Sequence, residues 1–240
     1  MQKSIINLRI KNYYFSAALL PILIFLCLFP LLISLGVWQI HRGDEKKRIQ
    51  IEFDQRHGAN PILLNHDDAI YGNQNYFPVL AEGRFDNKHN FLLDNKVHQH
   101  QIGYEVLTPF ILKNSAYVIL VNRGWIPQGK NRKILPLIKP IKGNTIITGL
   151  IVWPTKAFSL KTVAEKKWPQ RIQTLDPQFL SQKHLQPFIV VVSTRQYYSF
   201  IPLWQAVTLH ASRHYAYAFQ WFCLSITLLI AFFTSNTSRL

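Results

Sequence analysis

One histidine near the end of the chain has neighbours that suit ligand chemistry. His214 opens an apolar run over residues 215–236, and on a helix Tyr217, Trp221 and Ser225 would share its face. A neutral imidazole can offer one ring nitrogen to iron while the other donates an orienting hydrogen bond. An aromatic face with few polar groups suits a porphyrin. The pattern is equally typical of an aromatic belt at a membrane surface, which periodicity alone favours.

Two uncharged apolar runs must position this histidine. Residues 13–40 carry no charged side chain and would extend ~40 Å as a helix, more than the ~30 Å hydrocarbon core of a bilayer. This run is about twice as long as the apolar part of a signal peptide, so we expect a retained transmembrane helix after a short tail at 1–12. A second transmembrane helix is expected at 214–234, followed by a tail at 235–240.

Residues 41–213 are expected to form an extramembrane domain rich in β-strands. The charged stretch 44–57 continues the first helix, and Asp176 with Pro177 marks a later helix start. Period-two and fully apolar runs predict strands at 77–85, 91–97, 103–112, 116–121, 145–153 and 188–193. The predicted fold is two transmembrane α-helices flanking a mainly antiparallel β domain, a small barrel or sheet, with one or two short helices.

Composition narrows the function. All twelve Asp and Glu and 23 of the 27 Lys and Arg lie between the spans, which gives the central domain a net charge of +11. A dispersed basic surface suits membrane lipid headgroups, and without a binding motif it does not indicate nucleic acid. Cys27 and Cys223 fall in the spans, so no disulfide is expected in the domain. No catalytic motif is present and His98-Gln99-His100 lacks further ligands, so we expect neither an enzyme nor a metal other than the iron considered for His214.

Four segments together resemble a known family. They are LGVWQIHR at 35–42, GYEVLTPF at 103–110, VNRGWIP at 121–127 and RHYAYAFQWF at 213–222. In this order and around two membrane anchors, they resemble the surfeit-locus family of cytochrome c oxidase assembly proteins. The resemblance covers nearly the whole chain.

The resemblance implies a two-pass protein of the bacterial inner (plasma) or mitochondrial inner membrane, with its central domain on the periplasmic or intermembrane side. The first span begins within about a dozen residues of Met1, so we expect no long Arg/Ser-rich transit peptide, which favours the bacterial placement and hence the periplasmic side. The resemblance also implies a role in respiratory chain biogenesis: assisting cytochrome c oxidase subunit I, with haem a synthase as a further candidate partner. Bacterial members are expected to bind haem a transiently, and His214 matches the implied ligand. The alternative is a cofactor-free scaffold or chaperone for an oxidase assembly intermediate.

If haem is bound between the spans, further residues become candidates. His41 ends the first span at the membrane surface where the second begins, so we hypothesise that it supplies a second ligand opposite His214. Arg42 and Arg213 could pair with the haem propionates, because a guanidinium suits a carboxylate. Their alternative role is to extend towards lipid headgroups.

The VNRGWIP segment suggests a different site. Arg123 and Trp125 are predicted to lie where a central strand becomes a loop, and Arg and Trp are frequent anchors of protein interfaces. We therefore take them as candidates for docking a partner. The alternative is a satisfied turn beside a packed tryptophan.

Overall fold

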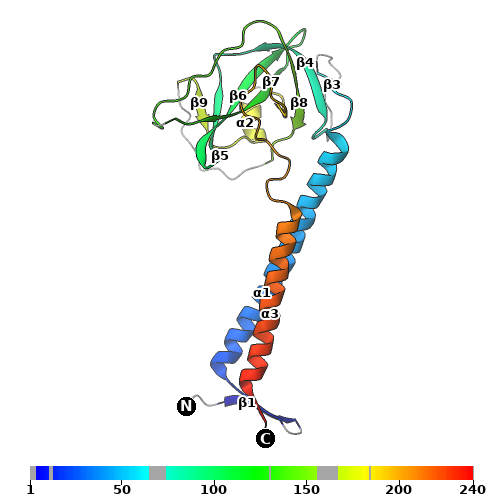
Figure 1. Cartoon of the computed structure of the whole chain (residues 1–240), viewed down its shortest axis with the longest axis vertical. Coiled ribbons are helices and arrows are strands. Elements are labelled where there is room, and N and C mark those ends of the chain that lie inside the picture. The colour runs from blue at the N-terminus through cyan, green and yellow to red at the C-terminus, as the bar shows by residue number, and fades with distance from the viewer. Residues whose placement is uncertain are drawn as a thin grey trace. The chain divides into compact units, whose positions relative to one another are not determined.

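A computed structural model describes residues 4–10, 13–64, 74–129, 131–155, 167–183 and 185–239 (Figure 1). The chain divides into two compact units. One unit comprises Met1–Ile51 and Val207–Leu240, and the other is Glu52–Ala206.

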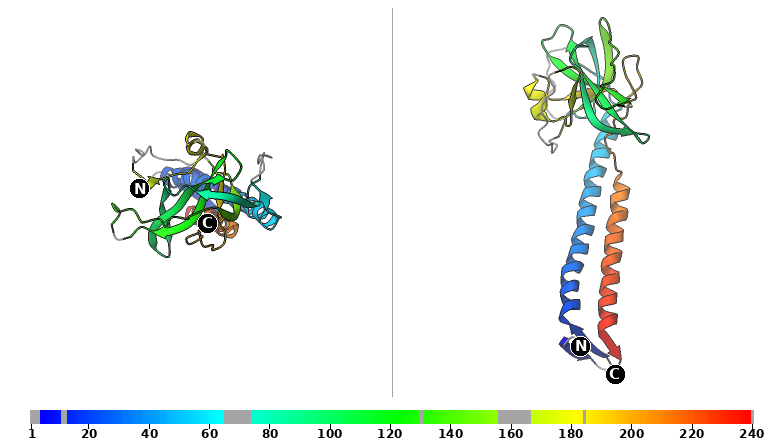
Figure 2. Two further views of the ribbon diagram at one scale, coloured as in Figure 1. Left: turned by 90° about the horizontal axis from the view of Figure 1, so that it is seen from above. Right: turned by 90° about the vertical axis from the view of Figure 1, so that its left-hand side faces the viewer.

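The first unit is built on two antiparallel helices that lie side by side (Figures 1 and 2). They are α1 (Leu19–Arg56), which continues into the second unit, and α3 (Ala211–Asn236). Both are long and apolar enough to cross a membrane, and only 6% and 11% of their most apolar windows are buried inside the protein. Apolar surface of this extent is stable when lipid covers it. The two predicted membrane helices are therefore confirmed as helices of the required length.

The start of the first helix differs from the prediction. Residues 13–18 belong to a strand, β2 (Tyr13–Ala18), and α1 begins at Leu19. β2 lies between β1 (Ser4–Ile10) and β11 (Thr237–Arg239) in a three-stranded sheet that the sequence did not predict. The cause is a non-local contact, since β2 pairs with the end of the chain and the ring of Phe15 lies about 6 Å from those of Phe232 and Phe233.

Small residues bring α1 and α3 into close contact. A Cβ atom added to Gly36 would lie 2.6 Å from the ring of Phe222, and one added to Gly43 would lie 2.5 Å from the ring of Tyr215. The two glycines and the two aromatic residues are each seven positions apart, so they repeat on one face of each helix. Glycine at such positions lets helices in a membrane approach closely.

The second unit contains a closed five-stranded barrel. Its strands, in order around the barrel, are β4 (Pro78–Phe85), β8 (Thr145–Val152), β10 (Ile189–Val191), β7 (Val118–Pro127) and β6 (Gln101–Leu112). Antiparallel pairing of β4 with β6 closes it, and only β10–β7 is parallel among these neighbours. The predicted mainly antiparallel fold is confirmed, and it is a barrel.

The barrel interior is an apolar core. Alternate residues of β4, Val79, Ala81 and Phe85, point into it with Phe110 and Val121. Three shorter elements accompany β5 (Phe91–His98), which pairs with β6 outside the barrel. They are β3 (Ile62–Leu63), β9 (Gln170–Ile172) and the helix α2 (Pro177–Gln182).

The predicted strands are all present, but one boundary was wrong. β7 continues through VNRGWIP to Pro127, where the sequence predicted a loop after residue 121. It continues because Trp125 pairs with Ile201, far along the chain. β3 and β9 were missed. The helix start at Asp176 is confirmed, since this carboxylate accepts a hydrogen bond from the amide of Phe179 at 2.7 Å.

Candidate functional site

His214 lies in the first turn of α3 and is buried, with 8% of its surface exposed. Its Nδ1 is 2.8 Å from Oε1 of Gln39 on α1, whereas its Nε2 is buried without a hydrogen-bond partner among the described residues. A buried polar atom normally has a partner, because leaving one unpaired costs about 1–3 kcal/mol. The unpaired Nε2 therefore marks His214 as the leading functional candidate in the helix pair.

Gln39 determines which nitrogen of His214 carries the proton. The amide oxygen of glutamine can only accept, so Nδ1 must donate, and in the neutral ring Nε2 then keeps its lone pair. A metal-binding histidine typically has this arrangement, with the second nitrogen held by an outer partner. Gln39 was not selected from the sequence. The one feature of the sequence that could have pointed to Gln39 is its position within the LGVWQIHR segment.

The other residues predicted to share the face of His214 differ in their burial. Ser225 is buried on the same side of α3 as His214, and Trp221 is half-buried. Tyr217 is 48% exposed, so it lies on the flank of the helix. The face that the protein buries is thus narrower than periodicity suggested, and it includes Ala218, whose small side chain suits close helix contact.

The structure does not bring His41 to His214. Gly36 and Gly43 mark the face of α1 that meets α3. At 100° per residue, His41 falls on the opposite face of α1, and its side chain is exposed. The hypothesis of two histidine ligands facing one another across the helix pair is therefore not supported by the structure.

The two arginine candidates lie at the same end of the helix pair. Arg42 forms an ion pair with Glu45, one turn further along α1, at 2.5 Å. Arg213 is exposed beside His214 in the sequence of α3. Arg42 therefore has a carboxylate partner in the protein itself, and pairing with another carboxylate would compete with Glu45.

The donor chemistry of this site fits haem iron. It provides one imidazole whose Nδ1 lies 2.8 Å from the side-chain oxygen of Gln39 and whose Nε2 has no hydrogen-bond partner within the described parts of the chain. Because Nε2 is covered by protein atoms, binding there requires neighbouring side chains to turn aside. His214 would hold the iron, and Gln39 would orient the ring.

Arg123 and Trp125, predicted to dock a partner, are instead buried, with 2% and 3% of their surfaces exposed. The indole N–H of Trp125 donates to the carbonyl of Lys96 at 2.9 Å, and its ring packs on His98. Neither side chain offers a docking surface in this structure. Both are packed inside the protein, as in the alternative interpretation, although the backbone here is a strand and not a turn. His98 is accordingly part of this packing, and the described residues contain no group of three candidate metal ligands.

Arg123 holds the barrel to the segment that precedes α3. Its Nε donates to the carbonyl of Tyr198 at 2.8 Å, and its guanidinium lies 4.8 Å from the ring centre of Phe200 and 5.3 Å from that of Phe85. Burial lowers the pKa of Arg123 to about 10, so it remains charged at neutral pH. The aromatic faces and carbonyl oxygens stabilise this charge in place of a carboxylate.

The backbone beside Arg123 makes the same connection. The amide of Phe200 donates to the carbonyl of Arg123 at 2.6 Å, and Trp125 and Ile201 exchange two hydrogen bonds. Gly124 lies between them at φ +105°, and a Cβ there would be 2.6 Å from the carbonyl oxygen of Ile201. The segment VNRGWIP therefore attaches residues 198–201 to the barrel.

A buried polar pair completes this region. Asn122 donates to Glu105 at 2.9 Å and accepts from the amide of Gly124 at 3.0 Å. Lys96 lies 3.4 Å from the second oxygen of Glu105. The Glu105 carboxylate on β6 is thus satisfied inside the protein, which is consistent with a structural role.

Comparison with known proteins supports the resemblance seen in the sequence. A model described as the SURF1 family matches residues 26–226. The chain is 29% identical to Surfeit locus protein 1 of Xenopus tropicalis over 136 residues, 49% of this chain and 43% of that protein. It is 31% identical to that of Mus musculus over 121 residues (44% and 40%), and 32% identical to that of Arabidopsis thaliana over 112 residues (42% and 32%). The chain thus spans less than half the length of these relatives.

Proposed function

Because the chain belongs to the SURF1 family, we propose that it is an assembly factor for cytochrome c oxidase that binds haem a at His214 and presents it to subunit I. The proposal includes a two-pass placement in a bacterial inner membrane, with the central domain on the periplasmic side. Oxidase subunit I and haem a synthase are its proposed partners. The chain acts by binding and presenting, not by catalysis.

One observation supports the haem part of this proposal more than any other. Nε2 of His214 is a buried nitrogen that has no hydrogen-bond partner among the residues that the structure describes, on a ring whose other nitrogen lies 2.8 Å from the oxygen of Gln39. Leaving such an atom unpaired costs free energy, which a ligand at this nitrogen would recover. Haem supplies an iron that takes a histidine nitrogen as an axial ligand.

The membrane placement explains how a site of this kind would be used. His214 lies in the first turn of a helix that is apolar over its remaining length. A hydrophobic porphyrin held there would stay within lipid, with its polar edge near the charged residues that follow Ile40 on α1. Transfer to another membrane protein would then require no passage through water.

The experiment is an absorption spectrum of the full chain, purified in detergent after co-expression with haem a synthesis. His214→Ala is compared with His210→Ala, an exposed histidine four residues earlier that makes no side-chain capping hydrogen bond. We expect the wild type and His210→Ala to carry a haem a band and His214→Ala to lose it. Oxidase assembly is measured in the same strains.

The outcomes separate the proposal from its alternative. Loss of both the haem band and oxidase assembly in His214→Ala supports a haem-handling factor. If neither the wild type nor the variants bind haem while assembly still depends on the chain, the cofactor-free scaffold is the correct function. A haem band that persists in His214→Ala would place the ligand elsewhere.

A further inference from the structure

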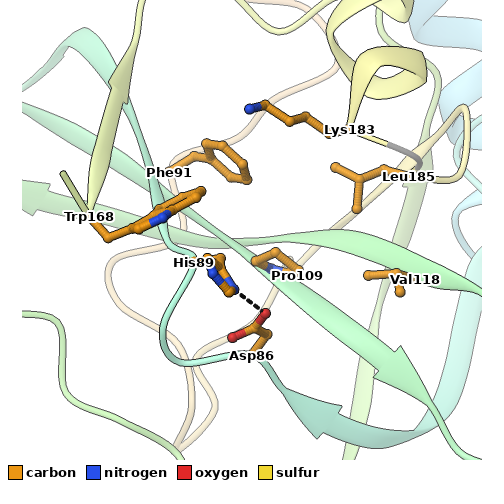
Figure 3. Close-up of a pocket in the computed structure, with 8 residues that line it drawn as sticks. All are labelled: Asp86, His89, Phe91, Pro109, Val118, Trp168, Lys183 and Leu185. Carbon is orange, nitrogen blue, oxygen red and sulfur yellow. Dashed lines mark hydrogen bonds and ion pairs between the residues drawn. The ribbon is translucent and has the colours of Figure 1, made fainter. Parts of the chain in front are cut away.

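A pocket of about 310 Å³ lies on the second unit, and Figure 3 shows the side chains that line it. Its lining residues are Asp86, His89, Phe91, Pro109, Val118, Trp168, Lys183 and Leu185. Five of these eight residues are apolar, and the others carry one ammonium, one imidazole and one carboxylate. Small-molecule sites typically have this composition, with apolar walls and a few polar groups that fix the orientation of the ligand.

The aromatic wall of the pocket is arranged edge to face. The rings of Phe91 and Trp168 lie 5.1 Å apart at 73°, and the ring of His89 lies 4.7 Å from that of Trp168 at 78°. Aromatic rings prefer such contacts to face-to-face stacking, so a further ring can extend the array with favourable geometry. The wall therefore suits an aromatic group better than a flexible chain.

The polar groups select the charge of a ligand. Asp86 is already engaged, since one oxygen lies 2.5 Å from Nδ1 of His89 and the other accepts from the amide of Lys88 at 3.1 Å. Lys183 has its ammonium 5.9 Å from the ring centre of Phe91, and no carboxylate in the described parts of the chain forms an ion pair with it. Because Lys183 lies next to an apolar wall and Asp86 already has partners, the pocket favours binding of an anionic ligand.

We propose that this pocket binds a small aromatic carboxylate, with its ring against Phe91 and Trp168 and its carboxylate on Lys183. The volume is consistent with this size, because benzene fills a cavity of about 150 Å³ and a short carboxylate arm needs less than the remainder. The site is independent of His214 and of haem, since all its residues belong to the unit Glu52–Ala206.

The test uses 4-fluorophenylacetate as the probe and the full chain in nanodiscs of zwitterionic lipid. Binding is followed by broadening of the fluorine NMR signal during a titration, and we expect a Kd on the order of 1 mM. Lys183→Gln should weaken binding about fivefold, as expected for loss of a charged partner at a partly exposed site. The neutral analogue 2-(4-fluorophenyl)ethanol should bind wild type and Lys183→Gln equally.

Two further variants separate a specific site from general attraction to a basic protein. Lys142→Gln removes an exposed positive charge elsewhere and should leave binding of the probe unchanged. Val118→Trp should fill the pocket and abolish binding of both compounds. The proposal is overturned if the broadening does not saturate, if Lys142→Gln weakens binding as much as Lys183→Gln does, or if a folded Val118→Trp variant binds as wild type.

Discussion

The side-chain oxygen of Gln39 on α1 lies 2.8 Å from Nδ1 of His214 on α3. One helix thus fixes the tautomer of a histidine on the other. The other nitrogen, Nε2, is buried and has no hydrogen-bond partner among the described residues, and it keeps its lone pair while this contact between the helices holds. The proposed ligand site is therefore a property of the helix pair, and not of α3 alone.

Replacing Gln39 by leucine should weaken haem binding without abolishing it. His214 would keep its ring but lose the partner that orients it, and loss of such an outer partner typically reduces metal affinity 10–100-fold. The measurement is a haem titration of the purified apoprotein. Gln220→Leu, at an exposed position on α3, is the matched control and should bind as wild type. Equal affinity for all three proteins would remove Gln39 from the site.

The contact between α1 and α3 should be sensitive to side-chain volume at Gly36. A Cβ atom at this position would lie 2.6 Å from the Phe222 ring, so Gly36→Ile must displace the ring or separate the helices. We expect a loss of about 1–3 kcal/mol in the free energy of unfolding, the range found for overpacked contacts. The check is the thermal unfolding midpoint of the detergent-solubilised full chain. Ser34→Ile, at an exposed position two residues earlier, should leave this midpoint near the wild-type value.

Two glycines with positive φ offer a matched test of the attachment of residues 198–201. At Gly124 an added Cβ would lie 2.6 Å from the carbonyl oxygen of Ile201, whereas at Gly129 it would meet nothing within 4 Å. Gly129→Ala should cost about 1 kcal/mol from backbone strain alone. Gly124→Ala should cost about 2–4 kcal/mol, because the hydrogen bonds with Ile201 are lost as well. Equal losses, measured by urea unfolding, would show that the crowding at Ile201 has no energetic effect.

Arg123→Met should destabilise the full chain by about 2–4 kcal/mol at pH 7, because it leaves the carbonyl of Tyr198 without its donor. The difference in the free energy of unfolding between the wild type and Arg123→Met should increase at high pH. Burial lowers the pKa of Arg123 to about 10 in the folded state, below its value in the unfolded chain. The unfolded chain then binds more protons above pH 10, so the wild type gains stability there relative to Arg123→Met.

The expected gain is about 1 kcal/mol at pH 10.5, with no change between pH 7 and pH 9. Urea unfolding of both proteins at the three pH values measures it. Using the difference between the two proteins cancels the titration of Lys and Tyr residues that they share. A difference that narrows above pH 10 would contradict the lowered pKa of Arg123.

The sequence was sufficient for features that depend on local pattern. Apolar length predicted both membrane helices, and alternation predicted the strands of the barrel. Contacts between distant residues were not predictable in this way. Gln39 and His214 are 175 positions apart, and the closing pairs between β4 and β6 depend on registers that alternation alone leaves open.

The VNRGWIP segment shows how local chemistry can mislead. The sequence predicted that the strand ends at residue 121 and that a loop follows it. In the structure Asn122 and Gly124 remain in β7, because Gly124 accommodates a positive φ inside the strand and residues 200–201 supply hydrogen bonds along its edge. Candidate docking residues were inferred from that predicted loop, and their burial follows from the same pairing.

The neighbours of β7 also bear on the order in which the chain can fold during synthesis. β7 ends at Pro127, but its parallel partner strand is Ile189–Val191, and its residue Trp125 pairs with Ile201. Because these partners lie more than 60 residues downstream, a ribosome must produce almost the whole second unit before the barrel can close. Until then the edge of β7 and much of the apolar core stay open to other chains. The interval just before α3 is made is thus when this protein itself most needs protection.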